Sequence, residues 1–238
     1  MTNISTLIEG IEDLNINLKK DQEDKFLLYK NLLMEWNEKI NITAIRDEKE
    51  IDIKHFLDSL TPVITNLFNG NEKVLDLGTG GGFPGLPLKI WNDNLDVTLL
   101  DSLNKRIIFL KEVISSLNLS GVEAVHGRAE ELARKEEYRE QYDVCISRAV
   151  ASLDTLSEYC IPFIKKGGHF ISMKGPDVEE EVENSKKAID KLGGKVIKVE
   201  KIQVPSSDIY HSLIIIKKIS ETDTKYPRGG GKPKKNPL

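Results

Sequence analysis

The chain has few cysteines and histidines and lacks long apolar runs. Its 238 residues include two cysteines, Cys145 and Cys160, and four histidines, with no CxxC or HxxxH spacing, so no metal site is expected. Both cysteines have apolar neighbours, which favours buried, reduced thiols in a cytoplasmic protein over a disulfide. No stretch of about 18 apolar residues is present to span a membrane. The N-terminus also lacks the basic and apolar segments of a secretory signal.

The charges are nearly balanced overall but uneven along the chain. The formal net charge is -4, which argues against a uniformly basic surface for nucleic acid. The last eighteen residues, 221–238, carry five basic and two acidic side chains, together with three prolines and three consecutive glycines. This composition predicts a tail that is disordered on its own and suited to phosphate contacts. A tail that only increases solubility is the alternative.

The first 70 residues are predicted to be helical. Apolar side chains recur at helical spacing from Phe26 to Ile40, and a second such stretch runs from Asp52 to Leu67. From residue 73 onwards, strands and helices alternate. Strands are predicted at 73–77, 96–101, 122–126, 142–147, 168–174, 195–204 and 213–219, and helices at 87–91, 105–117, 130–138, 153–163 and 178–192. The alternation predicts an α/β fold with a mostly parallel sheet covered by helices on both faces. No helix fits between the last two strands, so they are expected to pair antiparallel.

A glycine-rich turn follows the first predicted strand, in the segment VLDLGTGGGFPG at 74–85. The second strand ends at Asp101, where a carboxylate can accept hydrogen bonds from two ribose hydroxyls, as in nucleotide-binding βαβ units. Two ligands remain open on the glycines alone. Gly80-x-Gly82-x-x-Gly85 matches the dinucleotide pattern, whereas Gly78-x-Gly80-x-Gly82 after an acidic strand end matches the S-adenosylmethionine (SAM) pattern.

Several features favour SAM over a dinucleotide. A dinucleotide needs a helix N-terminus directed at its pyrophosphate, and Pro84 and Pro87 crowd the start of the next helix. SAM has no phosphate and needs a carboxylate for its cationic end, which Asp76 can supply directly or through water. The antiparallel end of the sheet is typical of class I methyltransferases, and the chain has no separate substrate domain. An NAD-dependent oxidoreductase is the alternative enzyme.

Polar side chains follow the other strands at the sheet edge where ligands bind. Glu130 is placed to contact adenine, although it also suits the first turn of a helix. Arg148 is costly to bury without a partner, which indicates a site residue. Lys174 is either a phosphate or base contact or a solvated strand end. Upstream of the glycine turn, His55 and Asp58 share a helix face and either close the pocket or belong to the core.

Taken together, these segments resemble the RsmG (GidB) family of bacterial 16S ribosomal RNA (guanine-N7) methyltransferases. The resemblance covers nearly the whole chain. Two departures are Ile42, where leucine is common, and Gly229-Gly230-Gly231, where the tail usually holds lysine and proline. The matching segments are Trp36-Asn37-x-x-x-Asn41-Ile42-Thr43-Ala44-Ile45, His55-Phe56-x-Asp58-Ser59, Asp76 to Gly85, Leu100-Asp101-Ser102-x-x-Lys105-Arg106, Gly127-Arg128-Ala129-Glu130, Ser147-Arg148-Ala149, Met173-Lys174-Gly175, Lys225-Tyr226-Pro227-Arg228 and Lys235-Asn236-Pro237-Leu238.

The resemblance implies a class I SAM-dependent methyltransferase with a Rossmann-like, seven-stranded sheet. It divides the chain into an N-terminal helical extension (1–70), a SAM-binding core (71–220) and a basic tail (221–238). A cytoplasmic monomer is expected. The SAM pocket is expected to use Gly78, Gly80, Phe83, Asp101, Ala129, Glu130 and Arg148.

The same resemblance implies a substrate. It is N7 of one guanine in the 530-loop region of 16S ribosomal RNA, within or near the small ribosomal subunit. No catalytic base is expected, because guanine N7 carries a lone pair and no proton. A non-catalytic ribosome-assembly factor that keeps the SAM fold is the second alternative. RNA contacts are expected from His55, Lys105, Arg106, Lys174 and Arg228.

Overall fold

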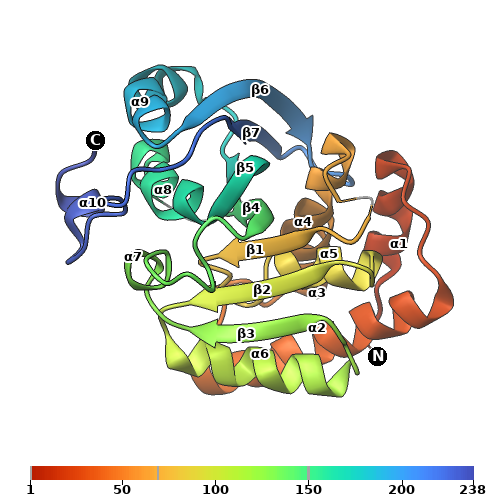
Figure 1. Cartoon of the computed structure of the whole chain (residues 1–238). Coiled ribbons are helices and arrows are strands. Elements are labelled where there is room, and N and C mark those ends of the chain that lie inside the picture. Colours follow the sequence, from red (N-terminus) through yellow and green to blue (C-terminus); the bar gives the residue numbers. More distant parts are fainter. Residues whose placement is uncertain (1, 69, 149–150) are drawn as a thin grey trace.

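A seven-stranded sheet lies at the centre of the computed structural model, which describes residues 2–68, 70–148 and 151–238 (Figure 1). The strand order is β3-β2-β1-β4-β5-β7-β6. Strands β1 to β5 pair in parallel, and β7 runs antiparallel to both β5 and β6, as predicted for the end of the sheet. The strands are β1 (Lys73–Leu77), β2 (Asp96–Asp101), β3 (Val122–His126), β4 (Tyr142–Ser147), β5 (Ile164–Lys174), β6 (Gly194–Gln203) and β7 (Tyr210–Lys218).

Helices cover both faces of this sheet, and each layer encloses its own apolar cluster. One cluster joins side chains of the extension to α5 and α6, and the other joins α8 and α9 to β4, β5 and β7. Both faces are buried, which explains why the central strands are almost continuously apolar. The helices are α1 (Ser5–Ile11), α2 (Lys20–Ile40), α3 (Glu48–Ile51), α4 (Asp58–Leu60), α5 (Gly85–Trp91), α6 (Asn104–Ser116), α7 (Ala129–Leu132), α8 (Leu153–Cys160), α9 (Glu179–Lys191) and α10 (Lys232–Lys235).

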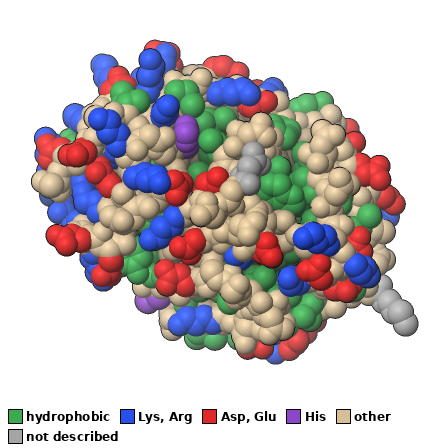
Figure 2. Space-filling model, turned by 45° about the vertical axis from the view of Figure 1, so that its right-hand side comes forward, with side chains coloured by type: hydrophobic (Ala, Val, Ile, Leu, Met, Phe, Trp, Pro, Cys, Tyr) green, Lys and Arg blue, Asp and Glu red, His purple; other side chains and the backbone are tan. Residues whose placement is uncertain are grey.

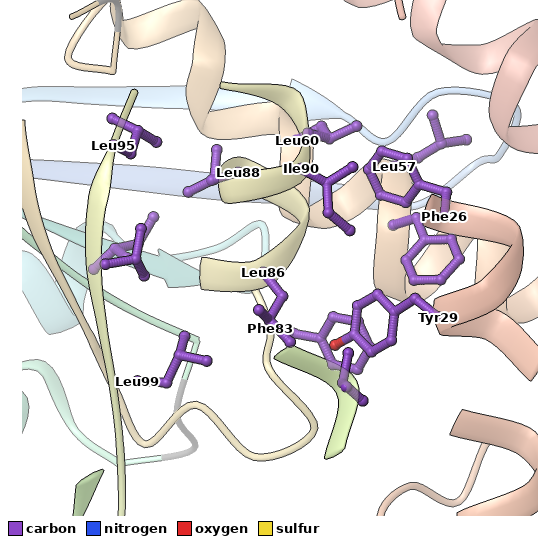
Figure 3. Close-up of a cluster of buried hydrophobic side chains, with 14 of the residues drawn as sticks. Phe26, Tyr29, Leu57, Leu60, Phe83, Leu86, Leu88, Ile90, Leu95 and Leu99 are labelled. Atoms are coloured by element: carbon purple, nitrogen blue, oxygen red, sulfur yellow. The ribbon is translucent and has the colours of Figure 1, made fainter. Parts of the chain in front are cut away.

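The N-terminal extension packs directly on the glycine turn. Tyr29 of α2 lies beside Phe83 in Figure 3, and the rings of Tyr29 and Phe83 stack with centroids 5.5 Å apart. The Tyr29 hydroxyl donates a hydrogen bond to the carbonyl of Gly81. Phe56 closes the cluster from the segment before α4, with its ring 5.2 Å from that of Phe26. The extension therefore supports the turn that follows β1.

Two of the predicted helices are wrong in extent or type. The helix predicted at 130–138 is limited to α7, and turns follow it to residue 140. The guanidinium of Arg139 donates to the carbonyl of Ala133 and to main-chain carbonyls of the tail, so this charged segment serves long-range contacts instead of a helix. The stretch predicted as one helix from Asp52 is a π-helical segment, Asp52–Leu57, followed by α4 and a 3₁₀ turn. Such π-helical turns occur frequently at functional sites.

The C-terminal tail is ordered against α8, which corrects the prediction of a disordered segment (Figure 1). Arg134 and Arg139 donate hydrogen bonds to main-chain carbonyls between Thr222 and Pro227. Arg228 forms a two-pronged ion pair with Glu158, whose side chain is 1% exposed. We refer to these contacts as the tail clasp. Composition alone could not predict it, because its partners lie about 70 to 90 residues away.

The surface carries charges of both signs. Figure 2 shows acidic and basic side chains interspersed over one face, together with scattered apolar side chains. None of the helices in the described ranges is long and apolar enough to cross a membrane.

A buried ion pair joins α2 to other parts of the extension, and its contribution to the free energy of unfolding can be tested. Lys30 and Asp52 are each 1% exposed, and the ammonium donates to the Asp52 carboxylate at 2.9 Å and to the carbonyl of Asn3 at 2.6 Å. Burial raises the pKa of Asp52, which the charge of Lys30 opposes. Lys30→Met leaves the carboxylate buried without its counter-ion, so we expect a loss of about 3 kcal/mol in the free energy of unfolding, measured in urea.

The solvent-facing pair between Lys25 and Asp21 on the same helix provides the control. Lys25→Met is expected to change the free energy of unfolding by less than about 0.5 kcal/mol. Equal effects of the two substitutions would contradict a structural role for the buried pair.

Candidate active site

A cavity of about 710 Å³ opens at the carboxyl ends of β1 to β4. Its wall combines the glycine turn with the ends of neighbouring strands, the position at which open α/β sheets bind ligands. The residues predicted for a cofactor converge there from four separate segments of the chain. The lining includes all seven of them, Gly78, Gly80, Phe83, Asp101, Ala129, Glu130 and Arg148.

The shape of the glycine turn depends on the buried carboxylate of Asp76. Its Oδ2 accepts hydrogen bonds from the hydroxyl of Thr79 at 2.6 Å and from the amide of Gly85 at 2.8 Å. Gly78 and Gly80 have φ of 74° and 62°, a conformation that glycine adopts without strain. Burial raises the pKa of Asp76 to about 6. Its Oδ1 is buried and has no hydrogen-bond partner among the described residues.

Asp101 connects the glycine turn to the start of α6. Its Oδ2 accepts from the amide of Gly80 and from Nη1 of Arg106, both at 3.0 Å, and its Oδ1 accepts from the amide of Leu103 at 2.9 Å. The carboxylate therefore faces the cavity and also caps the turn before α6, so the ligand and capping interpretations are compatible. Arg106, predicted as an RNA contact, lies in the wall of the same cavity.

The opposite side of the cavity comes from α7 and α8. Glu130 lies in the first turn of α7 with its side chain 10% exposed, and Nη1 of Arg128 is 3.9 Å from its carboxylate. Tyr159 of α8 also lines the cavity. Sequence reasoning missed Tyr159, because helical apolar spacing in that segment indicates only a residue that packs on the sheet. Nothing local distinguishes it from its neighbours.

Arg148 is held at the edge of the cavity by the extension. Its Nη1 donates to Oδ2 of Asp58 at 2.6 Å and to the carbonyl of Lys54 at 2.9 Å. The other carboxylate oxygen of Asp58 is 2.6 Å from Nδ1 of His211 on β7. Burial acts to raise the pKa of Asp58, but the hydrogen bond from His211 and the charge of Arg148 bring it below its usual value. Asp58 therefore stays ionised and fixes the guanidinium.

His55 is a neutral imidazole within this arrangement. Nη2 of Arg148 lies 3.3 Å from its Nδ1, which must therefore accept, while Nε2 lies 2.8 Å from the hydroxyl of Thr43. These contacts assign the proton to Nε2. The ring stacks on Phe83 with centroids 4.4 Å apart and planes 7° apart. Burial, together with the charge of Arg148, lowers the pKa of His55 to about 3.

A second cavity of about 460 Å³ adjoins the first, and Arg148 lines both. Lys174, predicted as an RNA contact, lies in this second cavity, where its ammonium is 2.8 Å from the carboxylate of Glu181. Sequence reasoning missed Glu181 and His211. The lining residues of the second cavity are Arg148, Ala151, Ser152, Met173, Lys174, Gly175, Glu181 and His211.

The other two residues predicted to contact RNA, Lys105 and Arg228, do not line either cavity. Lys105 is exposed and donates to the carbonyl of Ile40 at 3.0 Å, and Arg228 belongs to the tail clasp. Ala149, part of the motif around Arg148, lies outside the described residues. Across the part of the chain that the structure describes, no group of three histidine, cysteine or acidic side chains is arranged to hold a metal ion.

The neutral state of His55 predicts a pH dependence of stability. The imidazole binds a proton near pH 6.5 when unfolded but only near pH 3 when folded. The contribution of His55 to the free energy of unfolding is therefore fully present above pH 6.5 and is lost as the pH falls below that value. At pH 5 the loss from this residue is about 2 kcal/mol relative to pH 7.5. We expect His55→Gln to reduce the difference in urea unfolding between these pH values by that amount.

The exposed His126 provides a control for this measurement. His126→Gln is expected to retain the pH dependence of the wild type. An unchanged dependence in His55→Gln would contradict a neutral, buried imidazole at position 55.

Comparison with solved structures identifies the fold. The crystal structure of M. jannaschii TYW2 in complex with AdoMet matches with a TM-score of 0.53 at 19% identity, over 68% of this chain and 77% of that one. The crystal structure of TrmN from Thermus thermophilus matches with a TM-score of 0.52 at 16% identity, over 71% and 53%. These similarities confirm the predicted class I, Rossmann-like fold.

Relatives in sequence are much closer. The chain is 52% identical over 232 residues to "Ribosomal RNA small subunit methyltransferase G" of Alkaliphilus metalliredigens, covering 98% of this chain and 97% of the relative. It is 53% identical over 234 residues to the protein of the same name from Acetivibrio thermocellus, covering 98% and 95%. The family model described as "rRNA small subunit methyltransferase G" (GidB) matches residues 22–210. The resemblance seen in the motifs is thus confirmed, and this chain belongs to the GidB family of small-subunit ribosomal RNA methyltransferases.

Proposed function

We propose that this chain transfers the methyl group of SAM to N7 of one guanine in the 530-loop region of 16S ribosomal RNA. The reaction class follows from the family, whose members are SAM-dependent methyltransferases of small-subunit ribosomal RNA. Family membership also decides between SAM and a dinucleotide, the choice that the glycines alone leave open. The observation that carries the proposal is the pair of adjoining cavities, because one suits a cofactor, the other suits a base, and Arg148 lines both.

The first cavity fits SAM at both ends. Asp101 faces the cavity where the ribose hydroxyls of an adenosine would lie, and Glu130 and Tyr159 line the side assigned to adenine. At the other end, the buried carboxylate of Asp76 lies behind the glycine turn and supplies negative charge on the side proposed for the ammonium group of SAM.

The chemistry requires positioning more than acid–base catalysis. When bound, SAM supplies a methyl group on a sulfonium, and the sulfur–carbon bond breaks as the N7–carbon bond forms, leaving a neutral thioether and a cationic guanine. No side chain has to remove a proton, because N7 carries none. The protein instead orients the reactants, an effect worth several orders of magnitude in rate. Arg148, held by Asp58, His55 and the carbonyl of Lys54, provides a rigid wall between the two cavities.

A base must leave the RNA stack to reach such a site. We propose that the second cavity receives it and that basic side chains around the cavities bind phosphates. Lys105 and the tail lysines Lys232, Lys234 and Lys235 are exposed and suited to this role. Arg228, through its ion pair with Glu158, holds the tail in place.

We propose a matching division of the chain. The extension (1–70) shapes the SAM cavity through Thr43 and His55, the core (71–220) carries the reaction, and the tail (221–238) contacts RNA. We further propose that the chain acts as a monomer in the cytoplasm, where small subunits assemble. Sedimentation at micromolar concentration tests the monomer.

The primary experiment incubates the protein with methyl-labelled SAM and small subunits from a strain that lacks the gene, and then maps the label on the RNA. We expect label at N7 of a single guanine in the 530-loop region. Label elsewhere contradicts the assigned target. SAM binding without any label indicates a non-catalytic assembly role.

The position of Asp101 predicts a specific kinetic effect. Asp101→Asn removes the charge expected to accept from the ribose hydroxyls, so the KM for SAM should rise about tenfold or more while kcat changes little. The matched control is Asp96→Asn at the exposed start of the same strand, β2. Similar values of KM for SAM in the two variants would rule out the assigned role.

A further inference from the structure

We propose that Glu181 and Lys174 read the Watson–Crick edge of the target guanine in the second cavity. The inference rests on the proposed function and deepens it, because it assigns base specificity to two side chains. Both line the cavity that adjoins the SAM cavity at Arg148. Lys174 stands at the end of β5, and Glu181 lies in the first turn of α9.

The two side chains form an ion pair that leaves hydrogen-bonding capacity unused. Oε1 of Glu181 accepts from the ammonium of Lys174 at 2.8 Å and from the amide of Leu153 at 2.7 Å. Its Oε2 makes no hydrogen bond with any described residue. The ammonium carries three N–H groups and donates to Glu181 and to the carbonyl of Ala151, so one N–H is also left over within the described chain.

A free acceptor next to a free donor complements guanine. The Watson–Crick edge of guanine presents N1–H and the N2 amino group as donors and O6 as the acceptor beside them. Oε2 of Glu181, with its two lone pairs, can accept from N1–H and N2–H, and the remaining N–H of the Lys174 ammonium can donate to O6. Adenine presents an acceptor at N1, which would face the carboxylate oxygen, and a donor at its amino group, which would face the ammonium. The pair is thus complementary to guanine and mismatched to adenine.

The same orientation leaves N7 available to react. N7 lies on the five-membered ring, away from the N1 and N2 groups that Glu181 would bind. Arg148 forms the boundary with the SAM cavity, so a base held at Lys174 and Glu181 can present its five-membered ring to that boundary. The recognition edge and the reacting atom are then contacted by different parts of the site.

The side chains are shielded enough for such contacts to discriminate. The side chain of Lys174 is 12% exposed and that of Glu181 is 29% exposed. Hydrogen bonds to charged groups in a partly dry cavity distinguish bases more strongly than contacts in open solvent. A purely structural role for Glu181 is the competing explanation, because its carboxylate also holds the start of α8 through the amide of Leu153.

Inosine distinguishes recognition of the N2 amino group by Glu181 from a purely structural role of that residue. It keeps N1–H, O6 and N7 but lacks the N2 amino group. We would prepare small subunits with guanosine or inosine at the methylated position and measure kcat/KM for methyl transfer at saturating SAM. The wild-type protein is expected to use guanosine about tenfold or more faster than inosine, as a good base contact implies.

Substitution of Glu181 then provides the decisive comparison. Glu181→Gln should lower kcat/KM for guanosine towards that for inosine, so that the ratio between them falls close to one. Lys174→Met removes the donor to O6, which both bases carry, so it should slow both substrates and preserve the ratio. The control is Glu180→Gln, which makes the same change in charge at an exposed neighbouring residue and should keep the wild-type ratio.

The outcomes are distinguishable. If the wild type uses both bases equally, or if Glu181→Gln slows both while the ratio persists, Glu181 is structural and the inference is overturned. If Glu181→Gln does not fold, equal use of both bases by the wild type still overturns the inference. If the wild type methylates neither substrate, the proposed function itself fails.

Discussion

The ion pair between Asp58 and Arg148 determines the geometry of the whole site. It joins residues 90 positions apart at 2.6 Å, with the carboxylate 2% exposed. A buried charge is tolerated only where partners compensate it, and here His211 occupies the second carboxylate oxygen. The extension, the end of β4 and the antiparallel strand β7 therefore meet at one side chain. Both cavities share that point, so their relative position is built into the fold.

Much of the fold follows from local patterns. The first four strands have the predicted bounds, because short apolar runs between turns leave little freedom in register. The fifth strand begins at Ile164 rather than 168, because the chain pairs with Tyr142 before the register shifts near Val144. The region 130–138 and the tail were mispredicted for one reason. Their arginines have partners distant in sequence, and composition carries no information about such contacts.

The candidate site was predictable to the extent that its residues end strands. Parallel strands bring their carboxyl ends to one edge, so the amino-acid sequence alone suffices to place Asp101, Glu130 and Arg148 together. Tyr159 and Glu181 lie on helices and His211 lies within a strand, where ordinary spacing hides them. Their significance depends on which faces the helices turn towards the sheet, a matter of tertiary packing.

The contacts of the tail clasp determine which side chains of the C-terminal segment can be replaced. Arg134 and Arg139 bind main-chain carbonyls, and every residue type offers a carbonyl in the same place. The path of the segment therefore depends on its backbone and on anchors such as Thr222, Tyr226 and Arg228, and not on its exposed lysines. Outward-facing lysines can be exchanged while the backbone stays where it is. The C-terminal segment thus keeps its backbone path when its exposed lysines are replaced. Variants that differ in the charge of this segment can therefore be compared in the same fold.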